Sequence, residues 1–250
     1  MDDAAKSRVL GAAPAGAKDP ESASRAVREM FTAIAPRYDL LNHVLSANVD
    51  KLWWRRTARK FCSILARPDA KVLDLCCGTG DMAFALRRQG SEANITGADF
   101  SHAMLVRAAA KSDQKQKMRW IEADALRLPF PDESFDLVTS AFGFRNLADY
   151  DAGLREIHRV LRPEGEAGIL EFSEPEGLLR TFYDLYFQRI LPKIGNSISG
   201  VKGAYSYLPA SVARFPAPSE MLGRMKAAGF RETAWTSYAF GIAGLFRGKR

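Results

Sequence analysis

The chain has 250 residues, of which 47% are hydrophobic and 26% charged, with a formal net charge of +7. This length fits one large α/β domain with at most an appendage, and no apolar run approaches the roughly 18 to 20 residues of a membrane-spanning helix. Three cysteines, two of them adjacent, make no disulfide framework, and the acidic N-terminus lacks a secretory signal, so we expect a cytoplasmic protein. The charge alone names no partner, because basic clusters on helices are most often solvated.

The N-terminal region predicts a disordered tail followed by a helix. Residues 1–21 are rich in Ala, Gly, Asp and Lys and have no apolar period, which is typical of disorder. Ser22 or Ser24 can cap a helix that runs towards Ile34 and is interrupted at Pro36.

A second helical region follows. After a short segment over 38–45, apolar residues near helical spacing predict an amphipathic helix over about 50–65. We therefore expect residues 22–68 to form a helical cap ahead of the first strand, within a single domain over 22–250.

Strands and helices then alternate along the chain. We expect strands over 71–75, 94–98, 118–122, 135–141 and 165–172, and helices over 80–88, 101–111 and 149–161. This repetition predicts a doubly wound, Rossmann-like, mostly parallel sheet. An aromatic-rich insertion follows over 178–215, then a helix over 219–228 and two closing strands over 232–238 and 240–246, which we expect to pair as an antiparallel hairpin.

The segment 72–80 has the features of a cofactor loop. A short apolar strand stops at Asp74 and turns through Gly78 and Gly80 into a helix. Glycines let the backbone approach a ligand closely, and the helix N-terminus offers unpaired N–H groups. Cys76 stands where a further glycine would be expected, and the run from Gly78 also fits a dinucleotide fingerprint. The loop alone therefore does not choose between cofactors.

Two further acids favour S-adenosylmethionine. Asp99 follows the glycines by about 20 residues, where a carboxylate can accept both ribose hydroxyls, and Asp124 follows the third strand, where it can recognise the adenine amino group. Either acid alone could cap a turn. Together with Asp74 they converge on one crevice, and an NAD enzyme has no need of the third. Phe100 and Met104 can flank the adenine, although ordinary packing explains Met104 equally well.

Several longer runs are specific in combination. They are residues 30–42 (MFTAIAPRYDLLN), Ser46, 53–55 (WWR), 74–81, 124–135 (DALRLPFPDESF), 142–146 (FGFRN), 159–163, 170–173 (LEFS), 205–209 (YSYLP), 228–230 and 241–242. With them the chain resembles, over about residues 25–249, the UbiE/MenG family of quinone-biosynthesis C-methyltransferases.

The resemblance implies a class I methyltransferase fold and a reduced isoprenoid quinone as methyl acceptor. The acceptor is demethylmenaquinol or a polyprenyl methoxybenzoquinol, since one motif set serves both, and we expect demethylmenaquinol. The predicted residues around S-adenosylmethionine are Asp74, Gly78, Thr79, Gly80, Asp99, Phe100, Asp124, Ala125 and Ser140. Many members have a serine directly before the Phe-Gly pair, where this chain has Ala141, and a C-terminal histidine where it has Phe246.

Methylation of a ring carbon requires a neighbouring phenol to lose its proton. Because a free phenol has a pKa of about 10, a base or an electrostatic stabiliser should assist. We expect Arg145 to steady the phenolate, Asn146 to orient it, and Tyr38 to contact the methionine end. No metal is expected, because the three histidines show no ligand spacing. The alternative for Arg145 is a surface ion pair.

The remaining candidates concern the acceptor. Asp39 and Asn42 are expected to close over the methyl group, and Tyr205 and Tyr207 to line the quinol pocket, unless these tyrosines are core residues. An aromatic, basic-edged helix over 181–194 suits a polyprenyl tail or a bilayer surface, or else burial against the sheet or in a homodimer interface. No RNA-binding appendage is visible, so we expect no nucleic-acid partner. The rival functions are methylation of another small molecule and a non-catalytic binding module.

Overall fold

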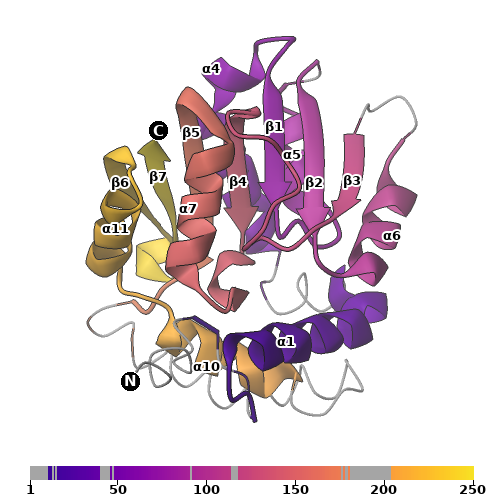
Figure 1. Ribbon diagram of the computed structural model, residues 1–250, viewed down its shortest axis with the longest axis vertical. Helices are drawn as coiled ribbons and strands as arrows, with labels where there is room; N and C mark the ends of the chain where they lie inside the picture. Colours follow the sequence, from indigo (N-terminus) through magenta and orange to yellow (C-terminus); the bar gives the residue numbers. More distant parts are fainter. Residues whose placement is uncertain are drawn as a thin grey trace, which may run out of the picture.

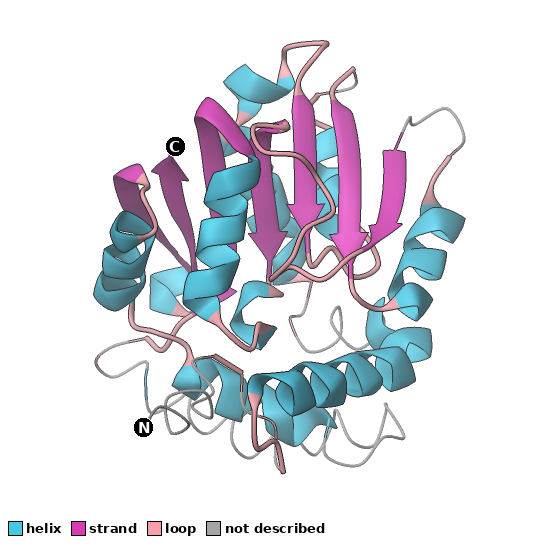
Figure 2. Cartoon of the chain, in the orientation of Figure 1, coloured by secondary structure: helices cyan, strands magenta, loops and turns pink. Residues whose placement is uncertain are grey.

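The computed structural model describes residues 11, 12, 14, 16–39, 46, 48–90, 92–113, 118–175, 177, 180 and 204–250. A seven-stranded sheet in the order β3-β2-β1-β4-β5-β7-β6 forms the middle layer (Figures 1 and 2). Its strands are β1 (Lys71–Leu75), β2 (Asn94–Asp99), β3 (Met118–Glu122), β4 (Phe135–Ala141), β5 (Leu161–Phe172), β6 (Arg231–Tyr238) and β7 (Ala243–Lys249). Only β7 runs antiparallel to its neighbours, β5 and β6, which confirms the predicted sheet and its C-terminal hairpin.

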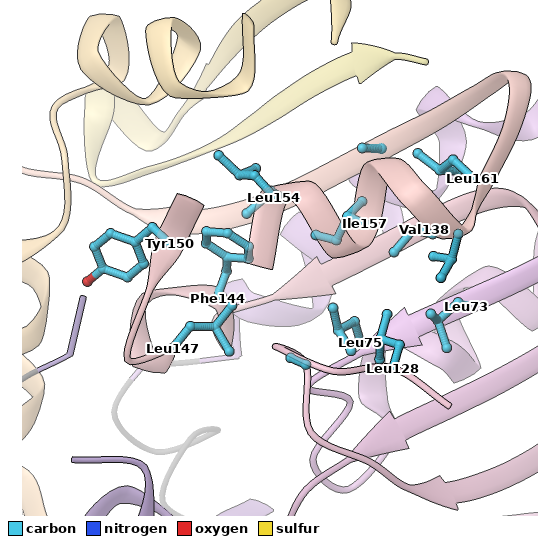
Figure 3. Close-up of a cluster of buried hydrophobic side chains, with 14 of the residues drawn as sticks. Leu73, Leu75, Leu128, Val138, Phe144, Leu147, Tyr150, Leu154, Ile157 and Leu161 are labelled. Atoms are coloured by element: carbon cyan, nitrogen blue, oxygen red, sulfur yellow. The ribbon is translucent and has the colours of Figure 1, made fainter. Parts of the chain in front are cut away.

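Helices cover both faces of this sheet. They are α1 (Pro20–Ile34), α3 (Val49–Lys60), α4 (Cys62–Leu65), α5 (Asp81–Arg87), α6 (His102–Lys111), α7 (Tyr150–Val160), α10 (Ala204–Arg214) and α11 (Pro218–Ala227), with 3₁₀ turns η1 (Ala35–Arg37), η2 (Phe144–Asn146) and η4 (Ala239–Gly241). Leu73 and Val138 pack towards α7 (Figure 3). Their neighbours Val72 and Leu137 pack on the other face with Phe61, because successive strand residues point to opposite sides. The sheet is therefore apolar on both faces, as parallel sheets are.

Several element boundaries differ from the predictions. The strand expected over 165–172 already begins at Leu161. The helix expected over 50–65 is divided at Phe61, whose ring packs so close to Gly168 of β5 that a Cβ there would lie 2.5 Å from the ring. The last strand begins at Ala243, not at residue 240, because Ala239 and Phe240 adopt left-handed backbone angles (φ 48° and 56°) in η4.

The N-terminal segment is more ordered than predicted. Helix α1 is capped by Asp19, not by Ser22 or Ser24, and Asp19 Oδ1 accepts a hydrogen bond from the Ser22 backbone N–H at 2.7 Å. Ser22 completes a capping box with Asp19, which is why the helix already starts at Pro20. Ala12 is buried, and its N–H donates to the Leu147 carbonyl at 2.8 Å. The prediction of disorder is therefore wrong for these parts of 1–21.

Helix α1 lies across the carboxyl ends of the parallel strands, with α10 beside it (Figure 1). Ile34 and Ala35 at its C-terminal end pack on Met104 of α6. The predicted cap therefore lies above the edge of the sheet where β1, β2 and β4 end. Of the predicted insertion over 178–215, the structure describes α10 and a few flanking residues, whereas the helix expected over 181–194 lies outside the described residues.

Candidate active site

A cavity of about 510 Å³ lies between the carboxyl ends of the strands and the helical cap. Parallel α/β sheets bind ligands at this edge, where the strand order reverses, here between β1 and β4. The predicted site residues that line it are Tyr38, Asp74, Gly78, Thr79, Asp99, Phe100, Asp124, Ala125, Arg145, Asn146 and Tyr207. The structure thus brings together residues from five separate sequence motifs.

Asp99 shapes the cofactor loop from the end of β2. Its carboxylate accepts hydrogen bonds from the backbone N–H groups of Gly78 at 2.8 Å and Ser101 at 2.9 Å. The side chain is almost completely buried, and burial raises its pKa to about 6. Asp99 therefore holds the glycine turn in place and still borders the cavity, as a ribose-binding acid must.

Asp74 has a carboxylate oxygen that no described residue satisfies. Its Oδ1 accepts the Thr139 hydroxyl at 2.8 Å, whereas its fully buried Oδ2 has no hydrogen-bond partner among the described residues. Burial raises the pKa of Asp74 to about 7. A buried acceptor without a partner is costly, so a cationic donor at this point of the cavity would be stabilised. The ammonium group of S-adenosylmethionine fits this requirement.

The other end of the cofactor region is apolar, apart from one carboxylate. Phe100, Met104, Ala125 and neighbouring Leu126 line it, which suits an adenine ring. Asp124 also borders it, and its Oδ1 accepts the Leu126 N–H at 2.9 Å. The turn-capping role and the predicted adenine contact are therefore compatible at this residue.

The backbone of the loop explains why a glycine would be expected at position 76. Cys76 has φ 53°, in the left-handed region that glycine adopts at little cost. Gly80, by contrast, does not line the cavity. It precedes α5 with φ 88°, and a Cβ there would lie 2.6 Å from the Trp120 ring. Backbone conformation and packing therefore account for a glycine at position 80. The structure does not place Gly80 where the predicted contact with the cofactor would be.

Two other predicted residues that the structure describes, Ser140 and Asp39, are not among those lining the cavity. Ser140 is buried in β4 and points away, because the strand alternation turns Ala141 towards the cavity instead. Asp39 accepts the Thr79 hydroxyl at 2.5 Å and the Lys111 ammonium at 3.1 Å, so it ties the cap to the cofactor loop. Asn42 and the side chain of Tyr205 lie outside the described residues.

The far part of the cavity is an aromatic pocket. The rings of Phe142 and Phe172 have centroids 4.4 Å apart, and Trp53 lies 5.8 Å from Phe142. Ile242 completes this wall. The pocket is lined by aromatic and aliphatic side chains, which suits an aromatic acceptor ring.

Asp50 brings a carboxylate to this aromatic pocket. It is only 4% exposed and shares the inward face of α3 with Trp53 and Trp54, three and four residues further on. Sequence reasoning placed it only at the start of a helix. The signal that could have found it is its helical spacing from the two tryptophans.

Arg145 is a buried residue, and the surface ion pair considered as its alternative is wrong. Its Nη1 lies 3.0 Å from Glu171 Oε2, and its backbone N–H donates to Glu171 Oε1 at 3.0 Å. The guanidinium also donates to the Phe142 carbonyl and stacks over Phe172. Burial alone would lower the pKa of Arg145, but the Glu171 carboxylate raises it, so the group stays cationic.

Glu171 was not singled out as a site residue, although it orders this end of the cavity. Next to Arg145, Asn146 accepts the Tyr207 hydroxyl at 3.1 Å through its Oδ1. The FGFRN and YSYLP motifs thus meet in space, as their predicted shared role at the acceptor requires.

The sheet order, the glycine turn and the two buried acids at the ends of β1 and β2 define a class I S-adenosylmethionine-dependent methyltransferase. The chain belongs to the ubiE/COQ5 methyltransferase family, whose model matches residues 19–250. It is 49% identical to a demethylmenaquinone methyltransferase of Deinococcus radiodurans, over 93% of this chain and 95% of that protein.

Other similar proteins carry names of the same family. A demethylmenaquinone methyltransferase of Thermus thermophilus is 48% identical, over 88% of this chain and all of that protein. The ubiquinone/menaquinone biosynthesis C-methyltransferase UbiE of Geobacter sulfurreducens is 44% identical, over 90% and 88%. Among solved structures, the [4+2]-cyclase SpnF has a TM-score of 0.67 at 17% identity, over 91% of this chain and 96% of that one. At this identity the likeness shows the fold alone.

The described residues contain no helix that is long and apolar enough to cross a bilayer.

Proposed function

We propose that the protein methylates a ring carbon of a reduced isoprenoid quinone, converting demethylmenaquinol to menaquinol. The observation that carries the proposal is the continuity of the cavity, which runs from Asp74 and Asp99 to the aromatic pocket of Trp53, Phe142 and Phe172. A cofactor and a flat aromatic acceptor can therefore meet inside one enclosed space. The names of the two most similar relatives reported above support the naphthoquinol.

In this proposal each end of the cavity has its own task. Asp74 and Asp99 hold the cofactor, which supplies an electrophilic methyl group when bound. Phe142, Phe172 and Trp53 stack on the acceptor ring and fix its carbon in line with that methyl. The helical cap excludes water, which strengthens the electrostatic interactions in the site.

Two charged groups serve the acceptor oxygen. Arg145 is cationic, buried and at the cavity wall, so it stabilises the negative charge that develops on the phenolic oxygen. We propose that the Asp50 carboxylate accepts the phenolic proton, because it is the acid on the wall formed by α3. Asn146 and Tyr207 orient the ring, and Tyr38, whose Cε1 would lie 3.8 Å from a Cβ on Gly78, covers the methionine end.

A second candidate acceptor is a polyprenyl methoxybenzoquinol, which is favoured by the relatives named for both quinone pathways. Its ring system has one ring where the naphthoquinol has two, and the three neighbouring aromatic side chains, Trp53, Phe142 and Phe172, offer more apolar contact to the larger one.

The test is an assay with S-adenosylmethionine whose methyl is ¹³C-labelled and with each quinol kept reduced. We expect a new carbon-bound methyl on the naphthoquinol, seen by NMR and mass spectrometry, and slower transfer to the benzoquinol. Oxygen-bound methyl, or no transfer to either acceptor, would refute the proposal. Quinone profiling of a strain lacking this step, with and without the gene for this chain, repeats the test in cells.

A further inference from the structure

Most of the exposed large apolar side chains among the described residues lie on two elements, α3 and η4. Four described residues of this kind are exposed: Val49 (38%), Leu52 (54%), Val106 (54%) and Phe240 (84%). Three of them, Val49, Leu52 and Phe240, lie on α3 and η4, and we call these three the mouth patch. Val49 itself and Ala239, the neighbour of Phe240, line the cavity. The mouth patch is therefore at the rim of the proposed active site.

Helix α3 contacts Tyr238, the last residue of β6, directly before η4. Thr57 of α3 donates a hydrogen bond to the Tyr238 hydroxyl at 3.3 Å, and the Arg56 guanidinium lies 4.4 Å from the centroid of the Tyr238 ring. Phe240 follows Tyr238 by two residues in the sequence. Its backbone is left-handed (φ 56°), a conformation that is unfavourable for a residue with a side chain. A strained turn thus presents an aromatic ring to the outside.

The exposed side of α3 is basic along its whole length. Apart from Leu52, its exposed positions after Val49 are Lys51, Arg55, Arg56, Arg59 and Lys60, which we call the basic face. None of these five forms an ion pair with a carboxylate of a described residue. Cations in the last turn favour the helix dipole, but Lys51 lies in the first turn, where a cation is unfavourable. Helix stability therefore does not explain the whole face.

We propose that the mouth patch and the basic face together dock the protein on a bilayer that carries anionic lipid headgroups. Cations on one face of a helix attract such headgroups, and apolar side chains beside them enter the boundary with the acyl chains. The inference rests on the proposed function, because an acceptor with a polyprenyl tail resides in the bilayer. Docking at this surface sets the cavity rim against the lipid from which the acceptor comes.

The charge requirement is tested with the full-length chain and sedimented vesicles of phosphatidylglycerol and phosphatidylcholine at low salt. The test variant is Lys51→Gln/Arg55→Gln/Arg59→Gln. Because each cation near an anionic surface contributes a factor of about five, we expect the loss of three to lower the partition coefficient about 100-fold. The control variant, Arg119→Gln/Arg155→Gln/Lys226→Gln, removes the same charge from exposed positions on β3, α7 and α11 and should bind like the wild type.

The apolar requirement has its own matched pair. Leu52→Gln/Phe240→Asn removes both exposed side chains, and asparagine tolerates the left-handed backbone at position 240. We expect a loss of at least tenfold in binding to the same vesicles, which added salt does not mask. Val106→Gln, at the exposed apolar residue on α6, serves as the control and should bind like the wild type.

Several results would overturn the inference. Wild-type protein that ignores anionic vesicles, or binds pure phosphatidylcholine equally well, has no such surface. The same holds if the control triple loses as much binding as the test triple, or if the basic face binds RNA and not vesicles. Transfer to an acceptor without a long tail, measured without vesicles, separates the two proposals. If the wild type does not methylate that acceptor, the proposed function is refuted. If it methylates the acceptor but does not bind vesicles, only the docking surface is refuted.

Discussion

Arg145 and Glu171 form a buried ion pair in which Nη1 lies 3.0 Å from Oε2, 26 residues apart in the chain and at the wall of the active-site cavity. Glu171 is fully buried and also accepts the Arg145 backbone N–H. The pair therefore joins the turn after β4 to the end of β5. It also fixes the direction of a cation that lines the cavity.

The pair predicts different effects on folding and on catalysis. Arg145→Met leaves the Glu171 carboxylate buried without its cation, and we expect the free energy of unfolding to fall by about 3–5 kcal/mol in urea titrations. The double variant Arg145→Met/Glu171→Leu replaces both charges by apolar groups and should regain most of that stability. It should bind S-adenosylmethionine normally but turn over at least 100-fold more slowly. Wild-type turnover by the folded double variant would exclude Arg145 from the chemistry.

Asp99 should be decisive for cofactor binding. Asp99→Ala removes the acceptor of two loop N–H groups, at Gly78 and Ser101, as well as the group proposed for the ribose. Hydrogen bonds to a charged group contribute about 1.5–3 kcal/mol each, so we expect the Kd for S-adenosylmethionine to rise at least 100-fold in calorimetry. Asp124→Asn, at a more exposed position, should change it less than tenfold. The reverse order of effects would contradict the assigned geometry.

Cofactor affinity should depend on pH through Asp74. Its pKa is raised to about 7, so below that pH the carboxyl is increasingly neutral and cannot pair with the ligand ammonium. The affinity for S-adenosylmethionine should therefore fall as pH drops below 7, by up to tenfold per unit, with release of a proton on binding. An α-amino group loses its own proton near pH 7.7–8, so affinity should peak between the two. Asp74→Asn should bind more weakly and lose the acid limb near pH 7, leaving only the fall near pH 6 where Asp99 is protonated, which calorimetry in buffers of different ionisation enthalpy can measure.

The sheet and the cofactor region followed from local patterns. Apolar strands of five to eight residues, most of them separated by a helix, define a parallel sheet, and acids that end successive strands must meet at one edge. The face of the sheet to which an individual strand residue points was harder to predict. Ser140 and Ala141 are neighbours, yet only Ala141 lines the cavity. A prediction one residue out in a strand turns the side chain to the opposite face.

Contacts between distant segments were not predictable in this way. Asp39 was expected over the methyl group but pairs with Thr79, forty residues away, and with Lys111. Glu171 stood in a quoted motif, yet nothing local distinguishes a buried acid with a partner from an exposed one. Such pairs depend on how the cap and the sheet pack together, which periodicity does not encode.

The left-handed Cys76 and the glycine of the FGFRN motif should be coupled. A Cβ on Gly143 would lie 2.4 Å from the Cys76 Cβ, so Gly143→Ala should destabilise the protein by about 1–3 kcal/mol. Cys76→Gly removes the opposing atom and suits φ 53°, and should recover part of that loss in the double variant. Thermal unfolding of the four proteins gives the coupling energy. Additive effects of the two substitutions would show that contact with the Cys76 Cβ is not the reason why residue 143 must be a glycine.

Asp50 is expected to act on the acceptor and not on the cofactor. Asp50→Asn keeps the shape of the side chain and an acceptor for the Lys51 N–H, which Oδ1 accepts at 2.8 Å, but it removes the base. Loss of a general base slows turnover by about 10²–10⁴, and we expect that loss with an unchanged Kd for S-adenosylmethionine. A second readout separates catalysis from structure. Because a base is needed only while the phenol holds its proton, the defect of Asp50→Asn should shrink as pH rises towards the phenol pKa of about 10. A defect that is constant with pH would leave Asp50 a structural role only.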